Sequence, residues 1–376
     1  MDRSAERIAR AGLSRVVEPG DPTAAEAIGD RPVTEVWDEL CDGARPPWAG
    51  RFSTARPERD LDAIERLGGR FVVPGDAEWP DEVAVLGESA EISRRCGVPF
   101  GLWVRGGLQL NLAVTRSVAL VGARACSSYG EHVAGELAAG LADQGVTVVS
   151  GGAYGIDAAA HRGALAASGV TVAVLACGLD QGYPKGNAAL FDRIAADGLL
   201  VSELPPGCSP TRLRFLARNR LIAAATGGTV VVEAAARSGA LNTASWAESC
   251  NRPVMAVPGP VTSATSHGAH ILVRERNAIL VTGVQDIAEA TAALGDLLTT
   301  YPRGAERETD RLGEIAQRVL DAVPVLAAVP EDRIARTAGL TEAAVRDGLA
   351  DLSRADLVER VGSGWRLSAS RREAVR

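Results

Sequence analysis

Two consecutive units of strand, glycine loop and helix lie within residues 118–161, and they constrain the fold of this chain more than any other feature. Each unit begins with a short apolar run, Val118–Val121 or Val146–Val149, of the kind that forms a buried parallel strand. Glycines at the carboxyl end of a strand let a ligand approach the backbone, and the N-terminus of the following helix attracts negative charge. The two loops together therefore predict an anion-binding site at the carboxyl ends of the two strands.

The two loops match neither of the common phosphate-binding motifs. They lack the G-x-G-x-x-G spacing of dinucleotide-binding folds and the G-K-[ST] ending of nucleotide-hydrolysing P-loops. In the first unit, Ser127 or Ser128 is expected to cap a helix that ends before Gly145. The inward face of that helix is expected to carry apolar residues at four-residue spacing, namely Val133, Leu137 and Leu141.

Further apolar strands alternate with helical segments along the middle of the chain. This alternation requires right-handed crossovers and a parallel sheet that helices cover on both faces. The predicted fold class is therefore α/β with a doubly wound parallel sheet. After the first two strands, the expected strands are Val170–Leu175, Leu199–Val201, Thr229–Val232, Val254–Val257 and Ile279–Val281.

A series of ordered motifs gives the chain a specific resemblance. The first loop reads G-A-R-x-x-S-x-Y-G from Gly122, and the second reads S-G-G-A-Y-G-I-D-x-x-A-H from Ser150. Over these and later motifs the chain resembles the DNA-processing protein A family, also called DprA or Smf, which implies a Rossmann-like core. The later motifs are Gly178-Leu179-Asp180, Tyr183-Pro184-Lys185 with Asn187, Ser202-Glu203, Phe215 with Arg218-Asn219-Arg220, Val232-Glu233-Ala234, Ser238-Gly239-Ala240 and Val257-Pro258-Gly259.

The chain departs from the family pattern at three places. Ala123 stands where serine is usual, which removes at most one hydroxyl contact. Leu216-Ala217 stands where the family has a proline, and this change could shift the loop before Arg218. Asn242-Thr243 replaces the more usual Ile-Thr pair.

The predicted domain order has four parts. A small helical domain over residues 1–70, loosely connected to the rest, precedes the Rossmann-like core over residues 71–297 and a polar linker over residues 298–310. Residues 311–376 follow the order helix, helix, turn, helix and hairpin, which is typical of a winged helix-turn-helix. From Glu306 onward there are 12 arginines and 13 acidic residues, a balance that favours protein contact or stabilisation over binding to duplex DNA.

The formal net charge of the whole chain is −7, which by itself disfavours binding to nucleic acid. Binding depends on local clusters of positive charge, however, and these can occur in a chain of negative net charge. A short segment without acidic residues surrounds Phe215, and an aromatic ring beside basic groups can hold single strands by base stacking. A core position for Phe215 remains the alternative. Lys185, the only lysine, lies in a predicted loop where open α/β sheets bind ligands. The arginines of the segment are Arg212, Arg214, Arg218 and Arg220.

Composition limits the other classes of function. The six cysteines are dispersed without a C-x-x-C pair, so neither a disulfide framework nor a metal site is predicted, and no cofactor is expected. No long uncharged apolar run occurs, and the first residues lack the apolar segment of a signal peptide. We therefore expect a cytoplasmic protein without membrane insertion.

Two classes of function remain open. The resemblance implies a non-catalytic single-stranded DNA-binding protein that protects single strands, forms a homodimer and loads the RecA recombinase during DNA uptake, natural transformation or recombination. The alternative is a nucleotide-processing hydrolase with a glycine-rich phosphate loop, in which Glu203 and Glu233 are the candidate acids because each follows a strand. Asp157 and His161, four residues apart on one helix, are interpreted as a structural pair. The predicted DNA-binding residues are Gly122, Arg124, Ser127, Gly151, Gly152, Lys185, Asn187, Arg212, Phe215, Arg218, Asn219, Arg220, Ser238 and Gly239.

Overall fold

The computed structural model describes residues 3–292 and 312–374. The chain divides into two compact units, residues 1–299 and 300–376. The linker predicted over residues 298–310 lies outside the described residues.

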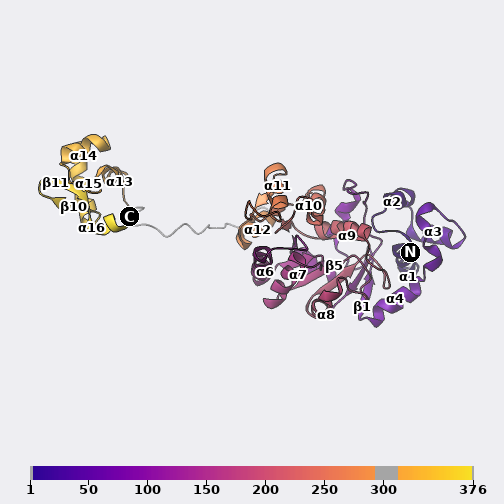
Figure 1. Ribbon diagram of the computed structural model, residues 1–376. Coiled ribbons are helices and arrows are strands. Elements are labelled where there is room, and N and C mark those ends of the chain that lie inside the picture. Colours follow the sequence, from indigo (N-terminus) through magenta and orange to yellow (C-terminus); the bar gives the residue numbers. More distant parts are fainter. Residues whose placement is uncertain (1–2, 293–311, 375–376) are drawn as a thin grey trace. The chain divides into compact units, whose positions relative to one another are not determined.

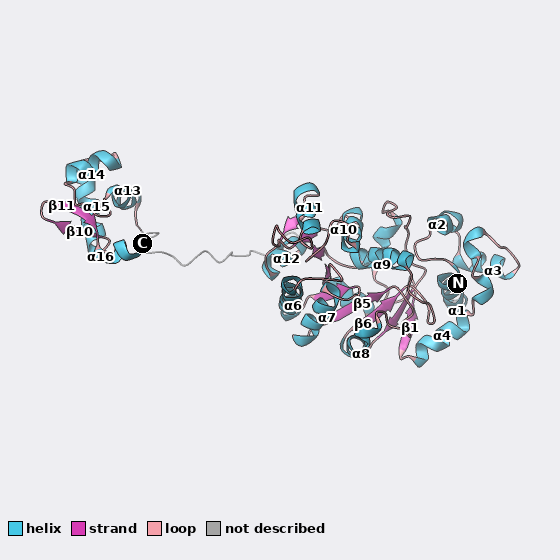
Figure 2. Ribbon diagram, in the orientation of Figure 1, coloured by secondary structure: helices cyan, strands magenta, loops and turns pink. Residues whose placement is uncertain are grey.

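Within residues 3–292, nine strands form one sheet in the order β1-β2-β6-β5-β4-β3-β7-β8-β9. Figures 1 and 2 show helices on both sides of this sheet, whose strands are magenta in Figure 2. Every pairing from β6 across to β9 is parallel, whereas β1 and β2 extend the sheet in antiparallel fashion beyond β6. The predicted α/β class with a mostly parallel sheet is confirmed. The strands are β1 (Gly69–Val72), β2 (Leu102–Arg105), β3 (Ser117–Val121), β4 (Thr147–Ser150), β5 (Thr171–Leu175), β6 (Leu199–Ser202), β7 (Thr229–Val231), β8 (Val254–Ala256) and β9 (Ile279–Leu280).

The direction in which the chain crosses the sheet reverses at β3. From β3 the chain passes outward through β4, β5 and β6, and it then returns to β7, which pairs with the other side of β3. The loops that follow β3 and β7 therefore leave the same edge of the sheet in opposite directions. In open α/β sheets such a reversal opens the crevice where ligands bind.

Helices cover both faces of the sheet, and alternate strand residues point to opposite faces. Val118 and Leu120 of β3 pack with Leu137 and Leu141, which confirms the predicted inward face of the first helix. The neighbouring Val121 packs on the other face in the cluster that contains residues of α9 and α10. The helices of the sheet region are α5 (Leu110–Thr115), α6 (Ser128–Asp143), α7 (Ile156–Ala166), α8 (Ala188–Asp197), α9 (Arg212–Ala224), α10 (Gly239–Ser249), α11 (His267–Glu275) and α12 (Val284–Thr291).

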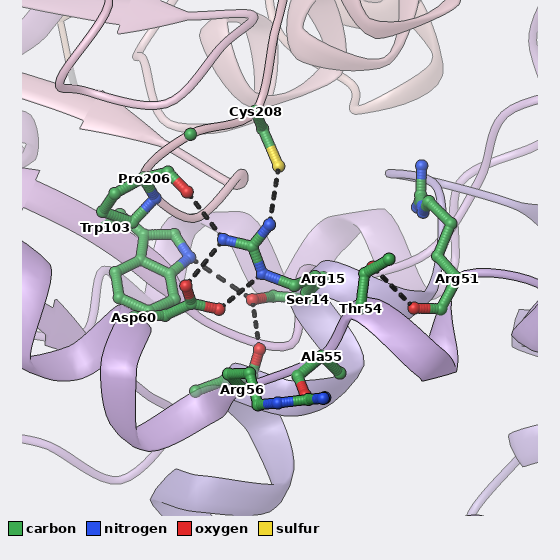
Figure 3. A network of polar contacts seen from close by, with 12 residues as sticks. Ser14, Arg15, Arg51, Thr54, Ala55, Arg56, Asp60, Trp103, Pro206 and Cys208 are labelled. Atoms are coloured by element: carbon green, nitrogen blue, oxygen red, sulfur yellow. Dashed lines mark hydrogen bonds and ion pairs between the residues drawn. The ribbon is translucent and has the colours of Figure 1, made fainter.

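The N-terminal helices pack directly against the sheet. Arg15 of α1 contacts both Asp60 oxygens at 2.5 and 2.6 Å, and it donates to the Pro206 carbonyl at 2.6 Å (Figure 3). Trp103 of β2 donates from Nε1 to the hydroxyl of Ser14 at 3.3 Å. This attachment differs from the loose connection expected for residues 1–70. The helices are α1 (Arg3–Val16), α2 (Pro22–Ile28), α3 (Val33–Cys41) and α4 (Pro57–Arg66).

The second unit has its own apolar core, formed by three helices and a hairpin. Thr341 caps the third helix of the unit, and Gly339 ends the second in a left-handed conformation with φ of +64°. Val329 pairs with Trp365 through two backbone hydrogen bonds of 3.1 and 2.8 Å, which adds a short bridge beside the hairpin. The elements are α13 (Glu314–Ala322), α14 (Glu331–Ala338), α15 (Glu342–Arg354), β10 (Val358–Val361), β11 (Gly364–Leu367) and α16 (Ala369–Ala374).

None of the helices in residues 3–292 and 312–374 combines the length and apolar content needed to cross a membrane.

Candidate nucleic-acid interface

A cavity of about 900 Å³ opens where the sheet reverses direction, between the loops after β3 and β7 and the start of α9. We call it the Phe215 cavity, since the partly exposed ring of Phe215 lies in its wall. Its volume is within the range of ligand-binding sites, about 300–1,000 Å³. The cavity therefore lies at the place that the doubly wound topology predicts.

Arginines dominate the charge of the Phe215 cavity. Arg124, Arg212 and Arg237 line it and are exposed, and none of them forms an ion pair within the described ranges 3–292 and 312–374. Asp157 is the only acidic side chain that lines the cavity in the part of the chain that the structure describes, and it is buried. The exposed charge at the cavity is thus positive and available to an anion.

Phe215 is surrounded by basic and aromatic groups. The Arg124 guanidinium carbon lies 4.5 Å from the centre of the ring, and that of Arg218 lies 5.9 Å from it. The Tyr183 ring is 5.8 Å away and tilted by 59°. Phe215 is half-buried and lines the cavity, so part of its ring is available for stacking.

Arg218 forms the buried floor of the Phe215 cavity. Its Nη1 donates to the Val174 carbonyl at 2.8 Å, and a Cβ at Gly151 would overlap its guanidinium. Burial lowers the pKa of Arg218 to about 10, and nearby Asp157 acts in the opposite direction. Arg218 is therefore still charged at neutral pH, and the absence of a side chain at Gly151 leaves room for its guanidinium.

The first glycine loop already holds an internal carboxylate. Glu233 accepts hydrogen bonds from the Ser127 backbone N–H at 2.8 Å and from the Ser127 hydroxyl at 2.5 Å. Thr265 donates to the same carboxylate at 3.1 Å, and a Cβ at Gly130 would overlap it. Ser127 also caps α6, as predicted, by accepting from the Gly130 N–H at 3.1 Å. The N-terminus of α6 is consequently occupied by Glu233.

The second glycine loop is shaped by Asn187. The Asn187 amide donates to the carbonyls of Gly152 and Ala153 at 3.0 and 3.3 Å. Gly152 has φ of +67°, a conformation that favours glycine. Asp157 accepts from the Ala153 N–H at 3.3 Å and so fixes the start of α7. Asn187 and Gly152 therefore hold the loop in shape.

Two arginines of the predicted cluster are paired with acids. Arg220 is fully buried and forms two hydrogen bonds of 2.6 Å with the carboxylate of Glu203. Arg214 pairs with Glu18 of the segment after α1, at 3.1 and 3.0 Å. These residues join distant segments of the chain, whereas Arg212 at the beginning of α9 is exposed.

Asp157 and His161 of α7 do not bond to each other. The Thr171 hydroxyl donates to the Val148 carbonyl at 2.7 Å, so the His161 Nδ1 proton is directed to the Thr171 oxygen, also at 2.7 Å. Burial lowers the pKa of His161 to about 3, and nearby Arg218 and Arg162 add to this effect. His161 is thus a neutral structural residue at physiological pH.

The structure brings together some of the predicted site residues and separates others. Ser127, Gly151, Gly152, Lys185, Asn187 and Arg220 do not line the Phe215 cavity, although the first three and Asn187 shape its loops. The predicted residues that line it are Gly122, Arg124, Arg212, Phe215, Arg218, Asn219, Ser238 and Gly239.

Several lining residues were missed by the sequence analysis. Arg237 directly precedes the Ser238-Gly239 motif, and a search for basic residues beside every motif could have found it. Tyr183 lies within a quoted motif but was not assigned to the site. Asn242 accepts from the Asn219 amide at 3.1 Å, a contact between helices that no sequence pattern signals.

No group of three or more histidine, cysteine or acidic residues is arranged to hold a metal ion within residues 3–292 and 312–374.

Comparisons with known proteins agree on one family. The family model described as DNA recombination-mediator protein A matches residues 70–292. The putative DNA processing protein DprA of Mycobacterium tuberculosis is 45% identical over 362 residues, which are 94% of this chain and 92% of that protein. Protein Smf of Escherichia coli is 42% identical over 192 residues, covering 51% of this chain and 50% of that protein.

Solved structures give the same result. The X-ray structure of DNA processing protein A from Streptococcus pneumoniae matches with a TM-score of 0.61 and 31% identity, covering 77% of this chain and 98% of that one. DNA processing protein A from Helicobacter pylori, for which a single-stranded DNA binding mode is described, matches with a TM-score of 0.50 and 26% identity over 58% of this chain and 94% of that one. The resemblance found in the motifs is confirmed, and the chain belongs to the DNA recombination-mediator protein A family, whose members include proteins named DprA and Smf.

Proposed function

We propose that this protein binds single-stranded DNA in the Phe215 cavity without catalysing a reaction. The observation that carries the proposal is the set of exposed arginines, Arg124, Arg212 and Arg237, around the accessible ring of Phe215. Arginines without acidic partners attract phosphates, and an aromatic face stacks on any base. The DNA processing protein A of Helicobacter pylori, to which the chain is similar, has a described single-stranded DNA binding mode.

The geometry favours single strands over duplex. Phe215 lies inside a cavity, so a base must leave its own stack to reach the ring. Arginines and backbone groups contact phosphates regardless of sequence, and we therefore expect binding without sequence preference. The predicted DNA-binding set then divides into residues that contact the strand, such as Arg124 and Phe215, and residues that support the loops, such as Asn187.

The hydrolase alternative loses its two candidate acids. Glu233 binds Ser127 and Thr265, and Glu203 is paired with the buried Arg220. A general acid or base needs free access to a substrate proton. The pairing of both carboxylates therefore favours a binding protein over a nucleotide-processing enzyme.

We also infer partners and a cellular role from family membership. Members with this core are expected to protect single strands, to form homodimers and to load RecA recombinase during DNA uptake, natural transformation or recombination in the cytoplasm. A homodimer carries two Phe215 cavities, and a long strand that reaches both gains apparent affinity. Light scattering would give the oligomeric state, and RecA filament assembly on protected single strands would test loading.

For the second unit we propose a winged helix-turn-helix. The order α13, α14, α15 and hairpin, together with the bridge between Val329 and Trp365, supports this assignment. Arg346 and Arg354 of α15 are paired with Glu331 and Asp351, so the helix offers little free positive charge to a major groove. We therefore assign the unit to protein contact or stabilisation.

A binding comparison tests the proposed function. Fluorescence anisotropy would compare single-stranded oligonucleotides, duplexes of the same sequence and mononucleotides, and a parallel assay would follow release of free base or phosphate. We expect tight binding to long single strands, weak binding to duplex and no release. Turnover of a mononucleotide would overturn the proposal in favour of the hydrolase.

A further inference from the structure

We propose that Tyr154, Tyr183 and Lys185 form a second nucleotide-binding subsite that continues the path of a single strand out of the Phe215 cavity. The proposal rests on the proposed function and extends it to a surface over the second glycine loop. None of the three residues is needed for the positive charge of the cavity itself. We call these residues the tyrosine subsite.

Tyr183 joins the tyrosine subsite to the Phe215 cavity. Its side chain is 44% exposed, and it lines the cavity. The centre of its ring lies 5.8 Å from that of Phe215, with a tilt of 59°. The rings are tilted rather than stacked face to face, and the exposed part of Tyr183 is available to a base that follows one bound at Phe215.

Tyr154 lies beside the turn that carries Lys185. It belongs to the second glycine loop and is 50% exposed. A Cβ at Gly186 would overlap the Tyr154 phenol, so the ring lies against the turn between Tyr183 and Asn187. Asn187 donates to the carbonyls of Gly152 and Ala153 and thereby fastens this turn to the loop. The two tyrosines therefore stand on a single supported surface.

Lys185 supplies the charge of the tyrosine subsite. It is exposed, and within the described parts of the chain it forms no ion pair. It belongs to the turn Lys185–Asn187, which follows Tyr183 in sequence and lies against the Tyr154 ring at Gly186. Stacking faces with an interposed cation are the combination that binds consecutive nucleotides of a single strand. Large aromatic side chains that are exposed close together also indicate a binding surface.

A series of oligothymidines of increasing length tests the tyrosine subsite. Binding of unlabelled strands of about 4 to 16 nucleotides, the range of known single-strand site sizes, would be measured by competition against one labelled strand. We expect Tyr154→Ala to weaken binding of long strands about 5- to 150-fold, the range of one lost base stack, and to leave binding of the shortest strands nearly unchanged. Tyr154→Phe keeps the ring and should bind like the wild type.

Controls separate the tyrosine subsite from the Phe215 cavity. Tyr129 is 41% exposed but donates to the Pro258 carbonyl at 2.7 Å. Tyr129→Ala should therefore not change the affinity for strands of any length. For long strands, Lys185→Gln should reduce the slope of log affinity against log salt concentration by about 0.7, whereas Tyr154→Ala should leave this slope unchanged.

Three outcomes are decisive. If Tyr154→Ala binds strands of every length like the wild type while Phe215→Ala weakens them, the tyrosine subsite is overturned and the proposed function stands. If Tyr154→Ala weakens the shortest strands as much as the longest, the residue does not act beyond the cavity and the subsite is likewise overturned. If neither Phe215→Ala nor Arg124→Ala weakens any strand, the proposed function itself fails.

Discussion

The Glu233 carboxylate accepts hydrogen bonds from both donors of Ser127, the backbone N–H at 2.8 Å and the hydroxyl at 2.5 Å. The positive end of α6 is thereby neutralised by a residue that follows β7, the strand on the other side of β3. A phosphate in the Phe215 cavity cannot use the same donors. The exposed positive charge at the cavity is that of arginine side chains, beside the beginnings of α9 and α10.

Glu233→Gln should destabilise the protein and leave DNA binding intact. An amide places an N–H₂ group toward the donors of Ser127, so at least one charge-assisted hydrogen bond is lost, at a cost of about 1–3 kcal/mol in the free energy of unfolding. Chemical denaturation measures this cost, and anisotropy with a single strand measures affinity. Glu131→Gln, on the exposed side of the same helix, is the matched control and should change stability by less than about 0.5 kcal/mol. A wild-type stability together with a large loss of affinity would place Glu233 in the binding site instead.

Arg220 and Glu203 should behave as a structural pair. Arg220→Met leaves the Glu203 carboxylate buried without its partner, which costs about 3–5 kcal/mol, whereas the double variant Arg220→Met/Glu203→Leu should recover much of that loss. Urea denaturation of the single and double variants gives the coupling free energy between Arg220 and Glu203. If Arg220→Met kept its stability and lost affinity for single strands, Arg220 would belong to the phosphate path.

The local elements of the fold could be predicted from the sequence. Apolar runs next to glycines place β3 and β4 to within one residue, and the cap of α6 is narrowed to Ser127 or Ser128, of which Ser127 is the cap, because these features depend on neighbouring residues. The antiparallel strands β1 and β2 were missed. Their four-residue lengths and lack of intervening regular helices leave little periodicity to detect.

The state of each charged side chain could not be predicted from the sequence. Arg214 and Arg212 are two residues apart, yet Arg214 pairs with Glu18, which lies 196 residues away, and Arg212 stays exposed. Ser127 and Glu233 are likewise separated by 106 residues. Whether a basic or polar residue is free to bind a ligand depends on such long-range partners, and a motif records only the residue type. For this reason the predicted list mixes lining and supporting residues.

Acid should destabilise the protein through His161. The pKa of His161 is about 3 in the folded protein and about 6.5 in an unfolded chain, so between these values the unfolded chain binds more protons. The contribution is fully present above pH 6.5 and falls by about 1.4 kcal/mol for each pH unit below it. Burial raises the pKa of Asp157, which has the opposite effect, so the difference between wild type and His161→Gln is the quantity to measure. That difference should shrink as the pH falls from 7 to 4. If the free energies of unfolding of the wild type and of His161→Gln differed by the same amount at every pH, His161 would not titrate in this way.

Removal of the second unit should leave single-strand affinity largely intact. All residues that line the Phe215 cavity in the described ranges 3–292 and 312–374 belong to the first unit, and the arginines of α15 are paired with acids. A chain that ends at residue 299 should therefore bind single strands within about tenfold of the full chain, a difference of about 1.4 kcal/mol. Anisotropy with the same oligonucleotide measures both, and circular dichroism checks that the shortened chain is folded. A larger loss in a folded protein would assign DNA contacts to the second unit.

The salt dependence of binding should distinguish phosphate contacts from stacking. Each of Arg124→Ala, Arg212→Ala and Arg237→Ala should weaken binding to every single-stranded sequence alike and reduce the slope of log affinity against log salt by about 0.7, because each removes one phosphate contact. Phe215→Ala should weaken binding by about 1–3 kcal/mol with an almost unchanged slope. The slope stays the same because a neutral ring binds no phosphate, so its removal does not change the number of counterions released on binding.

Arg336→Ala is the matched control for these variants, because Arg336 is exposed but paired with Asp332 in the second unit. Titrations at several salt concentrations give all of these slopes. An Arg124→Ala slope equal to that of the wild type would remove Arg124 from the phosphate path. A Phe215→Ala slope reduced as strongly as that of Arg124→Ala would mean that the ring acts by holding Arg124 in place, 4.5 Å from its centre, rather than by stacking on a base.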